Sequence, residues 1–97
     1  MSRREGDANV ITQSSVREVE VAGSAGLHAR PAADFAATAA RFRCDVLVSK
    51  GDLTADGKSV LLLLTLDVRQ GDRIVVRADG PDAEAAADAL AQMAATP

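Results

Sequence analysis

Residues 45–66 have the sequence DVLVSKGDLTADGKSVLLLLTL, and the changes of pattern along it indicate the fold. Asp45 to Lys50 places two valines on one face, which is the period of a β-strand. Gly51-Asp52 then turns the chain into a short segment that ends at Asp56-Gly57, so the stretch predicts a hairpin. Ser59 to Leu66 is a short apolar segment whose first residue suits an N-cap, and it predicts two helical turns.

Two segments before the hairpin predict a strand and a helix. In the segment that begins at Val16, Val19 and Val21 alternate with Glu18 and Glu20, which indicates a strand with one buried face, and Gly23 to Gly26 ends it. From Ala29 to Phe42 nearly every residue is small or apolar, as in a buried helix. Arg41 and Arg43 at its end suit the helix dipole.

Two segments after the hairpin complete the pattern. Gln70-Gly71-Asp72 signals a turn, and the alternation that follows as far as Asp79 predicts the last strand. Gly80-Pro81-Asp82 opens a final helix with Glu84 also at its positive end. Its apolar face at helical spacing comprises Ala83, Ala86, Ala87, Leu90 and Ala94.

This order of elements, βαββαβα, predicts an α+β fold. Each strand has one apolar face, and the helices need a surface on which to bury theirs. We therefore expect an open-faced two-layer sandwich, in which three helices cover one face of a four-stranded antiparallel sheet. A chain of 97 residues fits one domain, which we assign to residues 15–97. Residues 1–14 are polar without a clear period and are interpreted as a flexible N-terminal extension.

Composition excludes several classes of function. A net charge of -3 and an aromatic content of 2% argue against nucleic acid as a partner, because such binding needs clustered cations and stacking platforms. The single cysteine, Cys44, suits a reducing compartment and is interpreted as a packing residue. No signal peptide is evident, and Leu61 to Leu64 is too short to cross a membrane, which needs roughly 20 residues. We expect a cytoplasmic monomer without membrane insertion, metal or cofactor.

The motif Gly26-Leu27-His28-Ala29-Arg30-Pro31-Ala32 contains the only histidine of the chain. It lies at the junction of a loop and a helix, where unpaired backbone amides favour an anion. A phosphoryl group on His28 would meet the amides of Ala29 and Arg30. The Arg30 guanidinium would add charge-assisted hydrogen bonds. The alternative is a surface histidine beside a solvated arginine.

From Val19 to about Ala94 the chain resembles the HPr family, the histidine-containing phosphocarriers of the bacterial sugar phosphotransferase system. Residues 26–32 resemble the active-site signature of the family, and Gly57-Lys58-Ser59-Val60 resembles its second signature at a similar distance. The resemblance implies phosphorylation at Nδ1 of His28 by Enzyme I, with phosphoenolpyruvate as the ultimate donor. It also implies transfer to a IIA domain, with Arg30 as the partner of the phosphate.

Two residues depart from the family pattern. Ala25 stands where members often have Asn or Ser, so one polar contact near the site is missing. Leu62 stands where Gly or Lys is common, which affects the choice of partner.

Two interpretations apply to the segment that begins at Ser59. Its hydroxyl suits a helix cap, and the resemblance makes it a candidate regulatory site for HPr kinase. The leucine run is either a core helix or an exposed patch that docks partners through Val60, Leu61 and Leu64. One stripe suffices for the core, so we favour docking.

The sequence leaves the branch of the phosphotransferase system open. A sugar carrier, a nitrogen-branch carrier and a carrier linked to dihydroxyacetone kinase would share the His28 motif. A binding module that acts without phosphorylation is a further alternative. A stand-alone enzyme is not expected, because no carboxylate pair or nucleotide-binding glycine loop is evident.

Overall fold

The computed structural model describes residues 13–97, so nearly all of the expected extension, residues 1–14, lies outside the described residues. The order of the elements is the predicted βαββαβα. Strands and helices are β1 (Ser14–Glu20), α2 (Ala29–Ala39), β2 (Asp45–Lys50), β3 (Leu53–Asp56), α3 (Val60–Thr65), β4 (Arg73–Asp79) and α4 (Ala83–Ala95).

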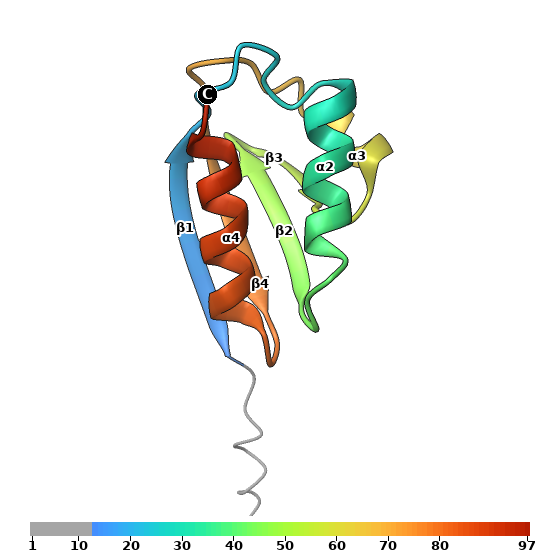
Figure 1. Ribbon diagram of the computed structural model, residues 1–97, viewed down its shortest axis with the longest axis vertical. Coiled ribbons are helices and arrows are strands. Elements are labelled where there is room, and N and C mark those ends of the chain that lie inside the picture. Colours follow the sequence, from blue (N-terminus) through green and yellow to red (C-terminus); the bar gives the residue numbers. More distant parts are fainter. Residues whose placement is uncertain (1–12) are drawn as a thin grey trace, which may run out of the picture.

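The four strands form one antiparallel sheet with the order β1-β4-β2-β3. The last strand therefore lies between the first two, and β1 and β3 are the edges. Figure 1 shows α4 in front of β1 and β4, while α2 lies in front of the other half of the sheet with α3 beside it. This arrangement confirms the predicted α+β fold with its two layers.

Inward-facing residues of the central strands meet the apolar faces of the helices. Val48 lies opposite Val76 in the β2–β4 register, and both side chains are fully buried. The predicted apolar face of α4 is also confirmed, because all five of its residues are buried. With few aromatic residues available, small side chains bring this helix close to the sheet, and Phe35 of α2 fills the larger space beside it.

The first helix is shorter than predicted. It ends at Ala39, so Arg41 and Arg43 lie beyond its last turn. Phe42 N donates to Ala39 O at 3.2 Å, a hydrogen bond between residues three apart, and this turn leads the chain toward β2. Arg43 instead binds the Asp82 carboxylate through its backbone N at 2.8 Å and its Nε at 3.3 Å, so Asp82 makes no side-chain cap on α4.

Two loops meet at one end of the sheet and carry the site. The chain between β1 and α2 lies beside the chain between α3 and β4, at the top of the view in Figure 1. Val21 N donates to Asp72 O at 2.9 Å, and Gly71 N donates to Val21 O at 2.8 Å. These backbone bonds fix the two loops to each other.

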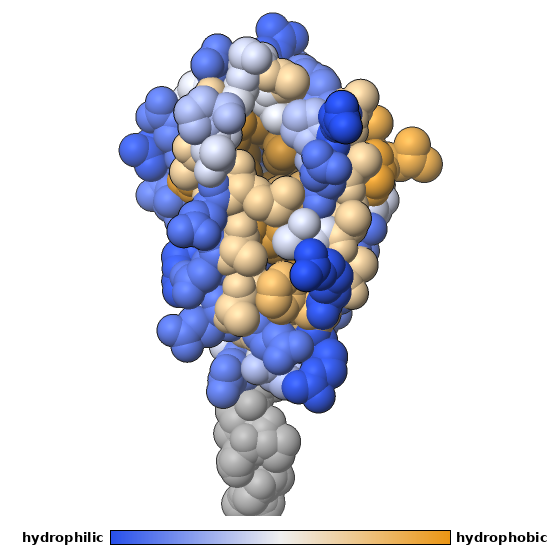
Figure 2. All heavy atoms as spheres, viewed as in Figure 1, coloured by the Kyte–Doolittle hydropathy of each residue, from blue (hydrophilic) through white to orange (hydrophobic). Residues whose placement is uncertain are grey.

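The surface is unevenly apolar. Figure 2 shows polar side chains around most of the molecule and apolar ones between α4 and α2, with a further apolar projection at α3. Among the helices of residues 13–97, none is long and apolar enough to cross a membrane.

Candidate functional site

Gly26 positions the N-terminus of α2. Its φ is +59°, a conformation that costs little only for glycine. A Cβ atom there would lie 2.1 Å from the carbonyl oxygen of Val68. This close approach lets Leu27 N donate to Val68 O at 3.0 Å and buries the Leu27 side chain. The loop after α3 therefore fixes the residue that precedes His28.

His28 is the N-cap residue of α2, with an extended backbone and no side-chain cap bond. Among residues 13–97, the amides of Ala29 and Arg30 have no partner in the loops, and no helix carbonyl precedes them. The predicted amides are thus available to an anion beside the imidazole, whose side chain is 49% exposed.

The imidazole has an oxygen neighbour at each ring nitrogen. Nδ1 lies 3.0 Å from the carbonyl oxygen of Ala25, and Nε2 lies 3.2 Å from Oδ1 of Asp67. Ala25 has no polar side chain, so it contacts the imidazole through its backbone carbonyl. The carboxylate comes from a residue 39 positions away in the sequence.

Asp67 belongs to a charged network in the second loop. Arg69 donates to its carboxylate from Nη2 at 3.1 Å and from Nε at 3.4 Å. The hydrogen bond from Arg69, followed by that from His28, holds the pKa of Asp67 below its ordinary value. Lys50 donates to the Asp67 carbonyl at 2.6 Å and pairs with Asp72 at 3.0 Å. The backbone amide of Arg69 and the Lys50 ammonium likewise lower the pKa of Asp72.

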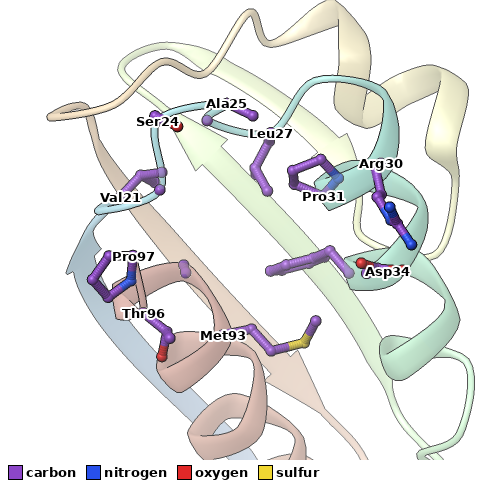
Figure 3. Close-up of a pocket in the computed structure, with 14 residues that line it drawn as sticks. Val21, Ser24, Ala25, Leu27, Arg30, Pro31, Asp34, Met93, Thr96 and Pro97 are labelled. Carbon is purple, nitrogen blue, oxygen red and sulfur yellow. The ribbon is translucent and has the colours of Figure 1, made fainter.

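Arg30 lies on the same turn of α2 as His28 but faces a different space. It lines a cleft of about 410 Å³ between α2, the first loop and the end of α4. Figure 3 shows Arg30 and Asp34 on one side of this cleft and Met93 on the other. The guanidinium is exposed and makes no hydrogen bond or ion pair with another residue of the described part of the chain. It is therefore available to phosphoryl oxygens.

Helix α3 presents a capped end and an apolar surface. Ser59 Oγ accepts a hydrogen bond from Leu62 N at 3.2 Å, the geometry of an N-cap. Leu63 is fully buried, so one stripe of the helix joins the core. Leu61 is 76% exposed and Val60 36% exposed, whereas Leu64 is half-buried against the core.

Sequence reasoning missed Asp67, Arg69 and the exposure of Leu62. Residues 67–69 precede the predicted turn, and no local signal relates them to a histidine in another loop. Leu62 is 47% exposed, which follows from a helix whose buried stripe is only one residue wide.

Cys44 is buried, and this burial raises the pKa of its thiol. Among residues 13–97 no group of three His, Cys, Asp or Glu side chains is placed to hold a metal ion.

The sandwich and the histidine at the start of its first helix define a class, the small phosphocarriers of the phosphotransferase system. Residues 15–96 match the model of the PTS-HPr family, the phosphorylation site of the HPr component. The chain belongs to this family and is a phosphocarrier of that system.

Individual relatives agree with this assignment. The chain is 38% identical over 80 residues to the phosphocarrier protein HPr of Haemophilus influenzae, a match that covers 82% of this chain and 94% of the relative. It is 38% identical over 74 residues to the phosphocarrier protein NPr of Shewanella violacea, with 76% and 81% covered. The crystal structure of HPr from Bacillus anthracis superimposes with a TM-score of 0.81 at 36% identity, covering 84% of this chain and 96% of that one.

Proposed function

We propose that His28 carries the phosphoryl group, which it receives from Enzyme I and ultimately from phosphoenolpyruvate, and passes to a IIA domain in sugar uptake. The observation that carries the proposal is the position of the only histidine, at a helix N-terminus beside the amides of Ala29 and Arg30, which have no partner among residues 13–97. A phosphoryl group on the imidazole gains hydrogen bonds from these two amides without displacing any bond that they already make within residues 13–97.

In this proposal Arg30 supplies the positive charge of the site. Its guanidinium is not engaged by another described residue, so it is able to follow the phosphoryl group through both transfer steps. The charge neutralises the oxygens, while Enzyme I and the IIA domain bring the other groups that align the transfer. These partners work in the cytoplasm, which is where we place the chain.

Helix α3 is proposed as the docking surface for these partners. Leu61 projects from it, beside Val60 and the half-buried Leu64, and apolar exposure of this kind is typical of a protein contact. Phosphorylation of Ser59 by HPr kinase would place a charge at the edge of this surface. Because Ser59 Oγ already caps α3, the modification would also alter the first turn of the docking helix.

The test of the proposal is phosphoryl transfer from labelled phosphoenolpyruvate in the presence of purified Enzyme I. The wild-type chain should acquire an acid-labile, base-stable label, and His28→Ala should acquire none. Arg30→Lys keeps the charge but lacks the planar fork, so it should be labelled and unloaded more slowly with an unchanged melting temperature. Undiminished labelling of His28→Ala would reject the proposal.

A nitrogen-branch carrier is the second candidate, favoured by the similarity to the NPr protein. Sugar-branch and nitrogen-branch Enzyme I proteins, supplied separately at limiting concentration, discriminate the two. The branch whose Enzyme I loads the chain faster, and whose IIA acceptor unloads it faster, is the one that it serves.

A further inference from the structure

Both ring nitrogens of His28 face hydrogen-bond acceptors, although a neutral imidazole has only one proton. The carbonyl oxygen of Ala25 lies 3.0 Å from Nδ1, and the carboxylate of Asp67 lies 3.2 Å from Nε2. Neither oxygen donates a proton. The two oxygens therefore compete for the single proton. The nitrogen beside the weaker acceptor keeps its lone pair.

The carboxylate is the stronger acceptor even though its distance is slightly longer. A hydrogen bond to an ionised acceptor is roughly twice as strong as one to a neutral carbonyl. The hydrogen bonds from Arg69 and His28 keep the pKa of Asp67 below its ordinary value, so the group is ionised at neutral pH. The proton consequently stays on Nε2, and the Nδ1 lone pair faces a carbonyl oxygen that repels it.

We propose that Asp67 is a positioning residue for phosphoryl transfer, which holds the imidazole proton on Nε2 and so makes Nδ1 of His28 the nucleophile. This inference rests on the proposed phosphorylation of His28. It gives the loop between α3 and β4 a role that the N-terminus of α2 does not fill, the choice of the nucleophilic nitrogen.

The transfer step balances without movement of the Nε2 proton. The incoming phosphorus takes the place of the Ala25 oxygen beside Nδ1. The Nδ1 lone pair forms a bond to it while the bond between phosphorus and the phosphohistidine nitrogen of the donor protein breaks. The electrons of that bond return to the donor imidazole. The acceptor ring then bears a positive charge, because it carries both the Nε2 proton and the phosphoryl group. Asp67 stabilises this charge through the hydrogen bond that already orients the ring.

The backbone and Arg69 hold Asp67 in place for this role. Its φ is +49°, a left-handed conformation that aspartate tolerates better than most residues. Lys50 fixes its carbonyl at 2.6 Å, and the fork of Arg69 fixes its carboxylate. The carboxylate thus has a defined direction although its side chain is 56% exposed.

The substitution Asp67→Gly removes the carboxylate and suits the left-handed backbone, so the fold should be retained. Asp67→Asn keeps the shape and removes the charge. The matched control is Asp88→Asn, which removes a carboxylate that is 61% exposed and is paired with Arg17 at 2.8 Å on other elements. Because the chain has a single histidine, nitrogen-15 NMR spectra of the imidazole report the tautomer of His28 without ambiguity.

With the ring neutral, the wild-type chain and Asp88→Asn should show the Nε2–H tautomer. Asp67→Gly should populate the Nδ1–H tautomer and accept the phosphoryl group about three- to tenfold more slowly, as expected for an exposed charge-assisted pair. Asp67→Asn should lie between them. Arg69→Lys should shift the tautomer less than Asp67→Gly does.

Wild-type tautomer and wild-type rate in Asp67→Gly would overturn the inference. A change in the rate without a change in the tautomer would overturn it too, since it would indicate a contact with the partner. A change in the tautomer without a change in the rate would show that the tautomer does not govern transfer. His28→Ala separates the two claims: if it still accepts label, the proposed function itself fails.

Discussion

Helices α2 and α3 begin in opposite ways. Ser59 caps the N-terminus of α3, because its hydroxyl oxygen accepts a hydrogen bond from the amide of Leu62. His28 occupies the equivalent position on α2 and caps nothing there, while the amides of Ala29 and Arg30 stay free of partners among residues 13–97. A capped helix start is stabilised locally, whereas an open one keeps its donors for a ligand.

The two helices also divide their surfaces differently. The face of α2 that holds Phe35 is buried, and this helix exposes no large apolar side chain. In α3 only Leu63 is buried, and Leu61 projects into solvent. If chemistry and partner contact belong to neighbouring helices, as we propose, substitutions that act on one should spare the other.

The largest effect is expected from Gly26→Ala, which disturbs the open N-terminus of α2. The new Cβ would lie 2.1 Å from the Val68 oxygen at a φ of +59°. We expect the free energy of unfolding to fall by about 2 to 4 kcal/mol, because strain and overpacking act together. Urea denaturation followed by circular dichroism measures this loss.

Gly51→Ala is the matched control for that substitution. Gly51 has the same φ of +59°, but a Cβ there meets nothing within 4 Å. Backbone strain alone should reduce stability by about 1 to 2 kcal/mol. Equal losses in the two variants would show that close packing against Val68 does not hold the start of α2.

An intermediate effect is expected from Leu61→Glu, which alters the exposed surface of α3. The side chain is 76% exposed, so stability should change by less than about 0.5 kcal/mol. Association with Enzyme I should weaken by about 1 to 3 kcal/mol if the residue docks there, measured as phosphotransfer at limiting partner.

Val16→Glu provides the comparison for docking, because Val16 is 52% exposed on the edge strand β1 at the opposite side of the sheet. It should transfer at the wild-type rate. An equal slowing of both variants would point to a general effect of added negative charge, and an unchanged rate in Leu61→Glu would remove α3 from the docking surface.

The sequence predicted the fold well because periodicity is a local property. The two valines of β2, the five residues of the α4 face and the Ser59 cap all follow from spacing within one element. The predicted C-terminus of α2 was wrong. Small residues continue past Ala39, but the chain turns there, and Arg43 after the turn binds Asp82, a residue far away in the sequence.

The two parts of the candidate site also differ in how far local sequence predicts them. Placing His28 and the amides required only the start of one helix, and these assignments stay predictions until phosphorylation is measured. Asp67 meets His28 only because Gly26 and Leu27 pack against Val68, a contact between two loops. Neither periodicity nor a motif within one loop reports such a contact.

The smallest effect is expected from Ser59→Ala, which opens the N-terminus of α3 and so makes it more like that of α2. Loss of the bond from Leu62 should lower the free energy of unfolding by about 1 kcal/mol, the usual contribution of a serine cap. Ser49→Ala on β2, where the serine is also half-buried, is the control and should change stability less. Phosphoryl transfer to His28 at saturating partner should be unchanged in both variants, because the amides proposed to bind the phosphate belong to α2. If Ser59→Ala slowed transfer at saturation, the two helix starts would be coupled, and the separation of chemistry from docking would be wrong.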